Sequence, residues 1–209
     1  MYSQNGEDKI VKNYFDNQNI KHGFVLDIGA NDGITFSNSR LLIENGWDAC
    51  LLEPSSVFGR LVELYEHSDN VTMFNVGIGE ENGIVEFFES GSIIDDKDSN
   101  LVSSAIPDER WKQATSFTKK EVPFLSFDTF TDLHFNDDEN PPVFDFISID
   151  AEGMDWEILS QIDLELFKVS CVCIEWNGNE TLATYFTRYC NDFGLSEIHR
   201  NPENIIFAR

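Results

Sequence analysis

A short apolar run that ends in a glycine-containing turn constrains the fold of this chain more than any other feature. Residues 24–29 read FVLDIG, which is typical of a buried parallel strand, and they open the turn DIGANDG at 27–33. Residues 37–45 have helical spacing and precede Gly46, and residues 49–53 (ACLLE) indicate a second buried strand. This order of strand, turn, helix and strand predicts a βαβ unit with parallel strands.

The same alternation continues to the end of the chain. Helices are expected at 7–15 (with Asn5 as the N-cap), around 58–65, at 154–162 and at 181–193. Strands are expected at 71–78, 144–150 and 170–176, with an antiparallel extension at 84–89 and a closing hairpin at 195–199 and 204–208. The pattern predicts an α/β protein with a doubly wound, mostly parallel sheet and helices on both faces, formed by residues 1–209 as one domain.

The middle of the chain breaks this pattern. Residues 90–121 are rich in Ser and Asp and have no helical or strand period. Loops of this length in compact domains usually bind ligands or close over a site, so we expect a lid or substrate loop here. Trp111 lies inside this loop and is a candidate lid residue. At the other end of the chain, residues 1–22 are expected to form a leading helical segment.

The charge of the chain restricts its partners. Asp and Glu number 38 against 14 Lys and Arg, which gives a formal net charge of −24. Nucleic acids and anionic membranes require clustered basic side chains, so neither is an expected partner. No apolar run approaches the length of a membrane span, and the four cysteines suggest buried free thiols in a reducing compartment, which predicts a cytoplasmic protein. The cysteines are Cys50, Cys171, Cys173 and Cys190.

The glycine turn is unsuited to a pyrophosphate. Dinucleotide-binding turns read G-x-G-x-x-G, whereas Asn31 stands here at the second glycine and the spacing differs. An NAD-dependent oxidoreductase is therefore a weaker alternative. Glu53 closes the second strand twenty residues after Gly33, where an acidic side chain accepts hydrogen bonds from ribose hydroxyls. The turn and Glu53 together predict a ligand that has a ribose but no phosphate.

Two further strand ends carry acids that face the same crevice. Asp150 ends one strand, Glu152 follows it, and Glu175 and Asn177 end the next. A carboxylate placed there can act as a general base. Alternatively, the carboxylates of Asp150 and Glu175 and the amide oxygen of Asn177 can hold Mg²⁺. Hydrogen bonds to loop amides are the structural alternative. His199, with an ordinary pKa near neutrality, is the other candidate base.

Several motifs in order resemble one enzyme family. DIGANDG, the strand end LLEPS at 51–55, FISIDAEGMDWEIL at 146–159 and the opening SQNGED at 3–8 resemble the FkbM-type S-adenosylmethionine-dependent methyltransferases. The closing NIIFAR at 204–209 fits the same pattern, so the resemblance covers nearly the whole chain. The family more often has Val-Glu-Gly-Ala-Glu where this chain has Ala-Glu-Gly-Met-Asp, a change that keeps the acids.

The resemblance implies a seven-stranded sheet with an antiparallel last strand and a methyl donor across the carboxyl ends of the strands. It assigns donor-binding roles to seven residues. Asp27, Gly29, Asn31 and Gly33 would line the methionine and ribose side, Glu53 would hold the ribose, and Asn75 or the backbone around Gly77 would approach the adenine. For Gln4 and Glu7 it suggests a segment folded over the site, and a plain capping helix is the alternative.

The expected function is methyl transfer from S-adenosylmethionine to a hydroxyl group of a sugar, glycan or small metabolite. Such transfer is an in-line displacement that depends on alignment, and a neutral hydroxyl must also lose its proton. Asp150 is the preferred base, with Glu152, Glu175 and His199 as further candidates. A non-catalytic cofactor-binding or scaffold module is the other alternative, and the acidic strand ends argue against it.

Overall fold

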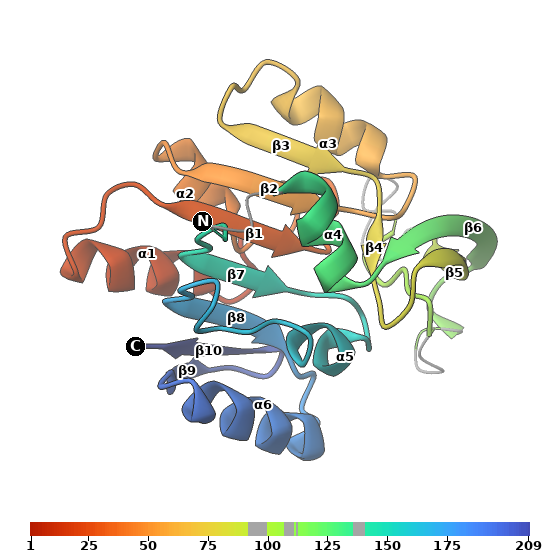
Figure 1. The fold of residues 1–209 in the computed structure, drawn as a ribbon. Coiled ribbons are helices and arrows are strands. Elements are labelled where there is room, and N and C mark those ends of the chain that lie inside the picture. Colours follow the sequence, from red (N-terminus) through yellow and green to blue (C-terminus); the bar gives the residue numbers. More distant parts are fainter. Residues whose placement is uncertain (92–99, 107–110, 112, 136–140) are drawn as a thin grey trace.

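The computed structural model describes residues 1–91, 100–106, 111, 113–135 and 141–209, and its centre is one large sheet. The sheet has seven strands in the order β3-β2-β1-β7-β8-β10-β9 (Figure 1). They are β1 (Phe24–Ile28), β2 (Asp48–Leu52), β3 (Val71–Phe74), β7 (Phe146–Ile149), β8 (Cys171–Glu175), β9 (Ser196–Arg200) and β10 (Asn204–Ala208). The strands from β3 to β8 are parallel, and β10 is antiparallel to β8 and β9, which confirms the predicted fold class.

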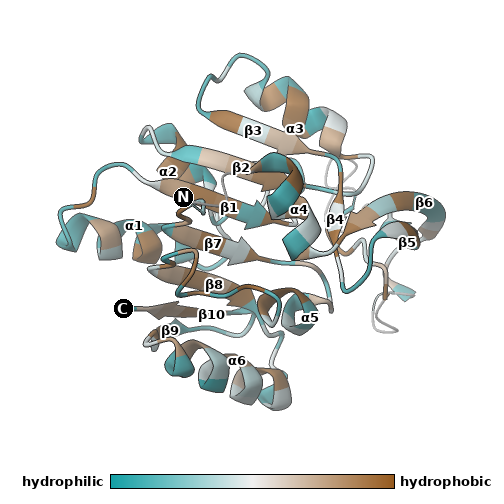
Figure 2. Ribbon diagram, viewed as in Figure 1, coloured by the Kyte–Doolittle hydropathy of each residue, from teal (hydrophilic) through white to brown (hydrophobic). Residues whose placement is uncertain are grey.

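Helices cover both faces of this sheet because its buried strands are apolar on both sides (Figure 2). Val25 belongs to the core on one face, whereas Leu26 and Ile28 belong to the core on the other, as the two-residue period of a strand requires. One core includes residues of α1 (Glu7–Asn17), α2 (Arg40–Glu44) and α3 (Phe58–Tyr65). The other includes residues of α4 (Phe127–His134), α5 (Asp155–Leu159) and α6 (Glu180–Asp192).

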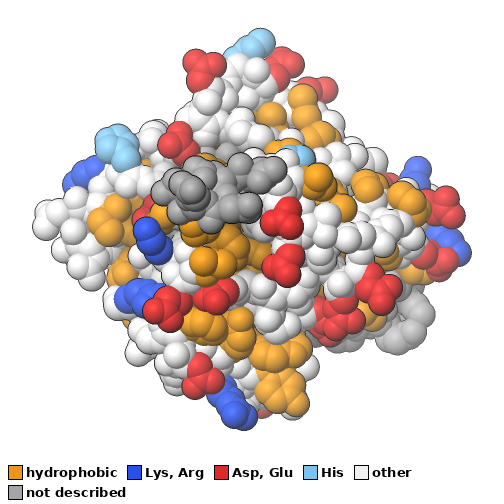
Figure 3. All heavy atoms as spheres, in the orientation of Figure 1, with side chains coloured by type: hydrophobic (Ala, Val, Ile, Leu, Met, Phe, Trp, Pro, Cys, Tyr) orange, Lys and Arg blue, Asp and Glu red, His pale blue; other side chains and the backbone are white. Residues whose placement is uncertain are grey.

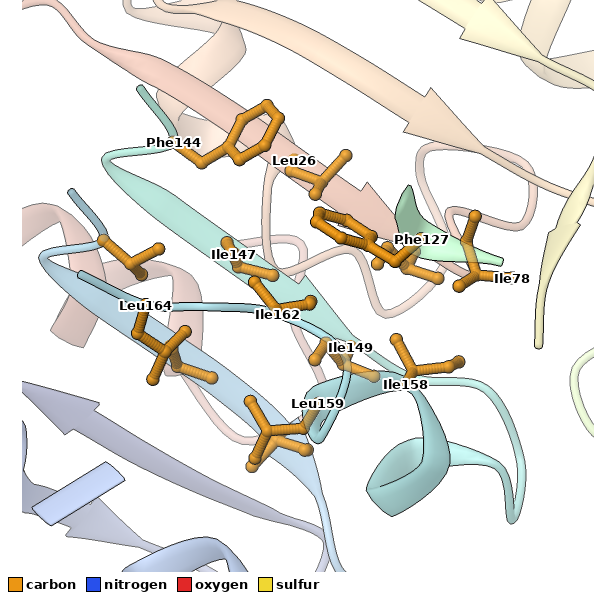
Figure 4. Packing of buried hydrophobic residues seen from close by; sticks show 14 of the residues in the cluster. Leu26, Ile78, Phe127, Phe144, Ile147, Ile149, Ile158, Leu159, Ile162 and Leu164 are labelled. Carbon is orange, nitrogen blue, oxygen red and sulfur yellow. The ribbon is translucent and has the colours of Figure 1, made fainter. Parts of the chain in front are cut away.

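The second core is the larger one and lies next to the strand ends that matter for function. Figure 4 shows Ile147 and Ile149 of β7 among Phe127, Ile158 and Leu159 from the covering helices. These side chains are almost completely buried. Interiors are close-packed, so this core holds the carboxyl end of β7 in a fixed position.

The predicted strand at 71–78 is wrong as one element, because the chain leaves the large sheet after β3. Asn75 turns its side-chain amide onto the carbonyl of Glu53, at 2.8 Å. Residues 77–78 form the short β4 (Gly77–Ile78), which pairs with β6 (Phe117–Leu125) in a second sheet. The predicted antiparallel segment 84–89 is β5 (Gly83–Ser90), and it pairs with β6 along its whole length.

Four smaller expectations also differ from the structure. The helix expected at 37–45 is only α2, because Ser37 and Ser39 use their hydroxyls in hydrogen bonds at its start. The N-cap of α1 is Gly6, in the left-handed region, rather than Asn5. Helix α4 is absent from the predicted elements, and β6 begins inside the stretch expected to be a loop.

The surface agrees with the acidic composition. Acidic side chains are spread over the face seen in Figure 3 and do not gather there in a single patch. All four cysteines are buried and free, as expected. Among the described residues no helix combines the length and apolar character needed to cross a membrane.

Candidate functional site

A cavity of about 480 Å³ lies at the carboxyl ends of the central parallel strands. Asp27 of β1, Asp150 after β7 and Glu175 of β8 line it from the large sheet. The second sheet, which lies beyond these strand ends in Figure 1, contributes Phe87 and Phe124. Ligands of open α/β sheets bind at this edge because the strand ends and their loops meet there.

The turn DIGANDG packs directly against the end of β7. Gly29 has φ of 92°, and a Cβ added to it would lie 1.8 Å from the carbonyl oxygen of Asp150. The backbone amide of Asp150 donates to the carbonyl of Ile28 at 3.0 Å. Only glycine permits this approach, so the turn sets the position of Asp150.

Gly29→Ala is expected to destabilise the protein severely, by more than about 3 kcal/mol, because its Cβ meets backbone that cannot move away. Gly59→Ala is the matched control, since Gly59 lies in α3 with no atom within 4 Å of an added Cβ. There alanine should be neutral or stabilise by up to about 1 kcal/mol. Thermal unfolding of both variants checks this, and equal melting temperatures would contradict the close packing.

Glu53 connects two loops at the edge of the cavity. Its Oε2 accepts a hydrogen bond from the backbone amide of Asn31 at 2.9 Å, and its Oε1 accepts one from Ser55 at 2.8 Å. Burial raises the pKa of Glu53, and the nearby Glu89 raises it further. The carboxyl group is thus held by both loops at the wall of the cavity, which it lines.

Asp27 is a buried acid at the end of β1, with only 4% of its surface exposed. Burial raises its pKa to about 6, although hydroxyls of Ser39 and Ser148 donate to it. The Ser39 bond is 2.5 Å long. An acid retained in such an environment at a cavity wall is typical of a binding or catalytic site.

Three carboxylates meet on the β7 and β8 side. One oxygen from each of Asp150, Glu152 and Glu175 lies within 4.8 Å of the other two. Burial raises the pKa of Asp150 to about 8, and the negative charge of Asp155 contributes next. Burial and the charge of Asp150 also raise the pKa of Glu175, which hydrogen-bonds to Asn177. This cluster can accept a proton, share one, or bind a cation.

Sequence reasoning did not single out Asp155, which builds the turn between Asp150 and α5. Its two carboxylate oxygens accept hydrogen bonds from the backbone amides of Ala151 and Gly153, at 3.0 and 3.1 Å. A short acid six residues after the end of β7, at the first position of α5, is the local signal for such a turn.

Three of the predicted site residues do not line the cavity. Gly33 packs against Leu61 of α3, where an added Cβ would lie 2.7 Å from the Leu61 side chain. Asn75 fastens the loop after β2, and His199 lies half-buried on the edge strand β9 opposite Ile206. The lining does include the other predicted site residues: Asp27, Gly29, Asn31, Glu53, Gly77, Asp150, Glu152, Glu175 and Asn177.

Part of the expected lid also reaches the cavity. The carbonyl of Asn100 accepts from the side-chain amide of Asn31 at 3.2 Å, and the hydroxyl of Ser104 donates to the carbonyl of Glu152 at 2.7 Å. Residues 100–103 and Trp111 line the cavity. The remaining parts of the predicted loop, 92–99, 107–110 and residue 112, lie outside the described residues.

Comparison with known proteins adds a family and a fold. A family model described as "Methyltransferase FkbM domain" matches residues 27–194. Among solved structures, protein PH1948 from Pyrococcus horikoshii, described as a candidate RNA methyltransferase, is 11% identical with a TM-score of 0.52, and the match covers 100% of this chain and 86% of that one. YhhF of Escherichia coli, described as a candidate methyltransferase, is 10% identical with a TM-score of 0.49 over 99% and 87% of the two chains. No match was found among curated proteins.

Proposed function

Because this chain belongs to the FkbM family of S-adenosylmethionine-dependent methyltransferases, we propose that it methylates a hydroxyl group of a sugar, glycan or small metabolite. The observation that best supports this proposal is the position of Asp150 in the sheet. It follows the central strand β7, with Asp27 and Glu53 on one side of it in the sheet and Glu175 on the other. A base at this position lies between two parts of the cavity: a donor half next to β1 and β2, and an acceptor half next to β8.

The donor half fits S-adenosylmethionine. When bound, this donor supplies an electrophilic methyl group on a positively charged sulfur. Asp27 and the turn at Gly29 and Asn31 would hold its amino-acid end, and Glu53 its ribose. Val76 and Gly77 line the cavity near Glu53, which supports the adenine side. The lack of a G-x-G-x-x-G turn continues to disfavour NAD.

Asp150 would accept the proton of the acceptor hydroxyl as the methyl group is transferred. Its environment raises its affinity for a proton above that of an ordinary aspartate, which makes it a stronger base once ionised. The turn at Gly29 and the hydrogen bonds of Asp155 fix its backbone. The protein's main contributions are therefore alignment of the two reactants and a positioned proton acceptor.

Asp150→Asn should lower methyl transfer by about 10²- to 10⁴-fold, the usual contribution of a general base, while donor binding persists. The matched control is Glu165→Gln, which also removes one negative charge but at an exposed site outside the cavity lining. Transfer of label from S-adenosylmethionine and a thermal-shift titration measure the two effects. Full activity of the Asp150 variant would exclude it as the base.

A divalent cation is the second candidate for activating the hydroxyl, favoured by the three carboxylate oxygens within 4.8 Å. The ligands would be Asp150, Glu175 and Asn177, joined by Glu152. A base mechanism predicts activity that survives chelation. Activity that EDTA removes and Mg²⁺ restores would favour the cation instead.

The first experiment is a thermal-shift titration with S-adenosylmethionine, S-adenosylhomocysteine and NAD. A ligand at 100 times its Kd stabilises a protein by about 2.7 kcal/mol, a clearly measurable shift. Stabilisation by the two methyl-donor compounds, and not by NAD, is expected. If neither S-adenosylmethionine nor S-adenosylhomocysteine shifts the melting temperature, the binding-module and oxidoreductase alternatives would be favoured instead.

The setting of the enzyme forms part of the same proposal. Residues 1–209 act as one domain in the cytoplasm, without a nucleic-acid partner. The four buried thiols support a reducing compartment, and the charge of −24 supports the absence of nucleic acid. Residues 100–103 and Trp111, which line the cavity, support a substrate-loop role for 90–121.

A further inference from the structure

One wall of the cavity comes from the two ends of the chain. Gln4 lies before α1, and Glu203 lies in the turn before β10, next to Asn177 after β8. All three line the cavity. Asn177 and Glu203 do so on the side opposite Glu53, since β8 and β10 follow β7 in the sheet and β1 and β2 precede it, and Asn5, the neighbour of Gln4 in the chain, donates to Glu203. If the donor occupies the β1 and β2 side, this wall faces the acceptor.

A buried carboxylate holds the wall together. Glu7 is completely buried, and its Oε1 accepts from the side-chain amides of Asn201 and Asn204 at 2.7 and 3.0 Å. Its Oε2 accepts from the backbone amide of Asn5 at 2.8 Å. These hydrogen bonds hold the pKa of Glu7 below its ordinary value, although burial alone would raise it. Glu7 is therefore an ionised link between the two segments.

The same link fixes Glu203. The side-chain amide of Asn5 donates to Oε2 of Glu203 at 2.7 Å. The carbonyl of Glu203 accepts from the backbone amides of Trp176 and Asn177, at 2.8 and 3.2 Å. Oε1 of Glu203 and the side-chain amide of Gln4 make no hydrogen bond within the described residues. The wall thus presents ordered polar groups with unused hydrogen-bonding capacity.

The charge of the lining limits what can bind there. Each ionisable side chain among the described lining residues is a carboxyl group, and none is Lys, Arg or His. They are Asp27, Glu53, Asp150, Glu152, Glu175 and Glu203. A phosphate or carboxylate on the acceptor would meet repulsion without a compensating cation, whereas hydroxyls can donate to carboxylate and amide oxygens.

We propose that Gln4, Asn177 and Glu203 form the acceptor-binding wall and that the acceptor is an uncharged polyhydroxyl compound of the glycoside type. This inference rests on the proposed function. Phe36 and Trp111 line the same cavity and offer apolar surface to a sugar ring. Gln4 and Glu203 lie outside the matched residues 27–194.

The test uses the complex with S-adenosylhomocysteine and two probes that differ only at one carbon. They are methyl glucoside and the corresponding uronic acid, and saturation-transfer NMR measures their binding. The glucoside is expected to bind and the uronic acid to bind at least tenfold more weakly. Equal binding of these two, or binding of no probe to a protein that holds S-adenosylhomocysteine, would overturn the inference.

Variants separate the wall from the rest of the site. Gln4→Ala and Glu203→Ala should weaken glucoside binding at least fivefold and leave the thermal shift with S-adenosylhomocysteine unchanged, whereas Glu165→Gln should change neither. Unchanged glucoside binding in both wall variants would refute their role. A wild-type protein without any shift by S-adenosylhomocysteine would instead refute the proposed function itself.

Glu7 acts as a positioning residue, so its variants require a second readout. Glu7→Ala should weaken glucoside binding and lower the melting temperature together. Glu7→Gln retains one acceptor oxygen for Asn201 and Asn204 and should recover part of the glucoside binding. Identical glucoside binding by both variants would mean that Glu7 supports the fold alone.

Discussion

Asp27→Asn is expected to stabilise the ligand-free protein at pH 8 while weakening the binding of S-adenosylmethionine. Burial raises the pKa of Asp27 from 3.8 to about 6 in the folded state. Between these values the folded protein keeps a proton that the unfolded chain has lost, so the free energy of unfolding falls as the pH rises. Above about pH 7 the full penalty is present, about 3 kcal/mol. Because asparagine does not ionise, the variant removes this penalty, and its amide can still hydrogen-bond with Ser39 and Ser148.

Urea unfolding of wild type and variant at pH 8 and pH 5 tests this result. The stability gained by asparagine should be about 2–3 kcal/mol at pH 8 and about half as large at pH 5, where the folded wild type is mostly protonated at this site. Donor affinity should fall at least tenfold, measured by calorimetry. A stability difference that is the same at both pH values would show that ionisation of Asp27 is not its cause.

Glu53→Gln should produce the largest loss of donor affinity, about 10²-fold. Each hydrogen bond from a ribose hydroxyl to a carboxylate contributes about 1.5–3 kcal/mol, and glutamine replaces one acceptor oxygen by a donor. That amide would also face the backbone N–H of Asn31 or Ser55, which costs about 1–3 kcal/mol of stability. The variant should therefore melt at a lower temperature as well.

A comparison of ligands isolates the ribose contact from the loss of stability. Wild type should bind adenosine at least tenfold more tightly than 2′,3′-dideoxyadenosine, measured by displacement of S-adenosylhomocysteine. Glu53→Gln should bind the two nucleosides nearly equally. If the variant keeps the wild-type preference, Glu53 organises the loops and does not hold the ribose.

The sequence patterns predicted the buried elements better than the exposed ones. In β1 every residue after Phe24 is buried, so its apolar run has few alternatives. In β6, Lys119 and Lys120 are exposed and only Val122 and Phe124 are buried, so the segment looks like a loop until it pairs with β5. That pairing joins segments that are far apart in the sequence, so the hydrophobic period of residues 117–125 alone does not predict it.

The site was predictable where chemistry coincides with a strand end. Asp27 and Asp150 follow apolar runs, and the sheet brings both to one cavity. His199 has suitable chemistry but lies on an edge strand away from that cavity, which its local sequence does not reveal. Helix α4 did have a local signal, since Ser126 caps it by accepting from the amide of Thr129 at 3.2 Å.

The reversed direction of β10 has a consequence for how such a fold can diversify. At the edge of the sheet where the cavity lies, each parallel strand ends, so the loop that follows the strand is located there. Because β10 runs in the opposite direction, it begins at this edge, and the loop that precedes it is located there. The turn at 201–204 therefore reaches the cavity, which Glu203 lines, although it lies far along the chain from Asp27 and Asp150. If this turn belongs to the acceptor-binding wall as we propose, insertions or exchanges there would change what is methylated without disturbing the donor turn or either core.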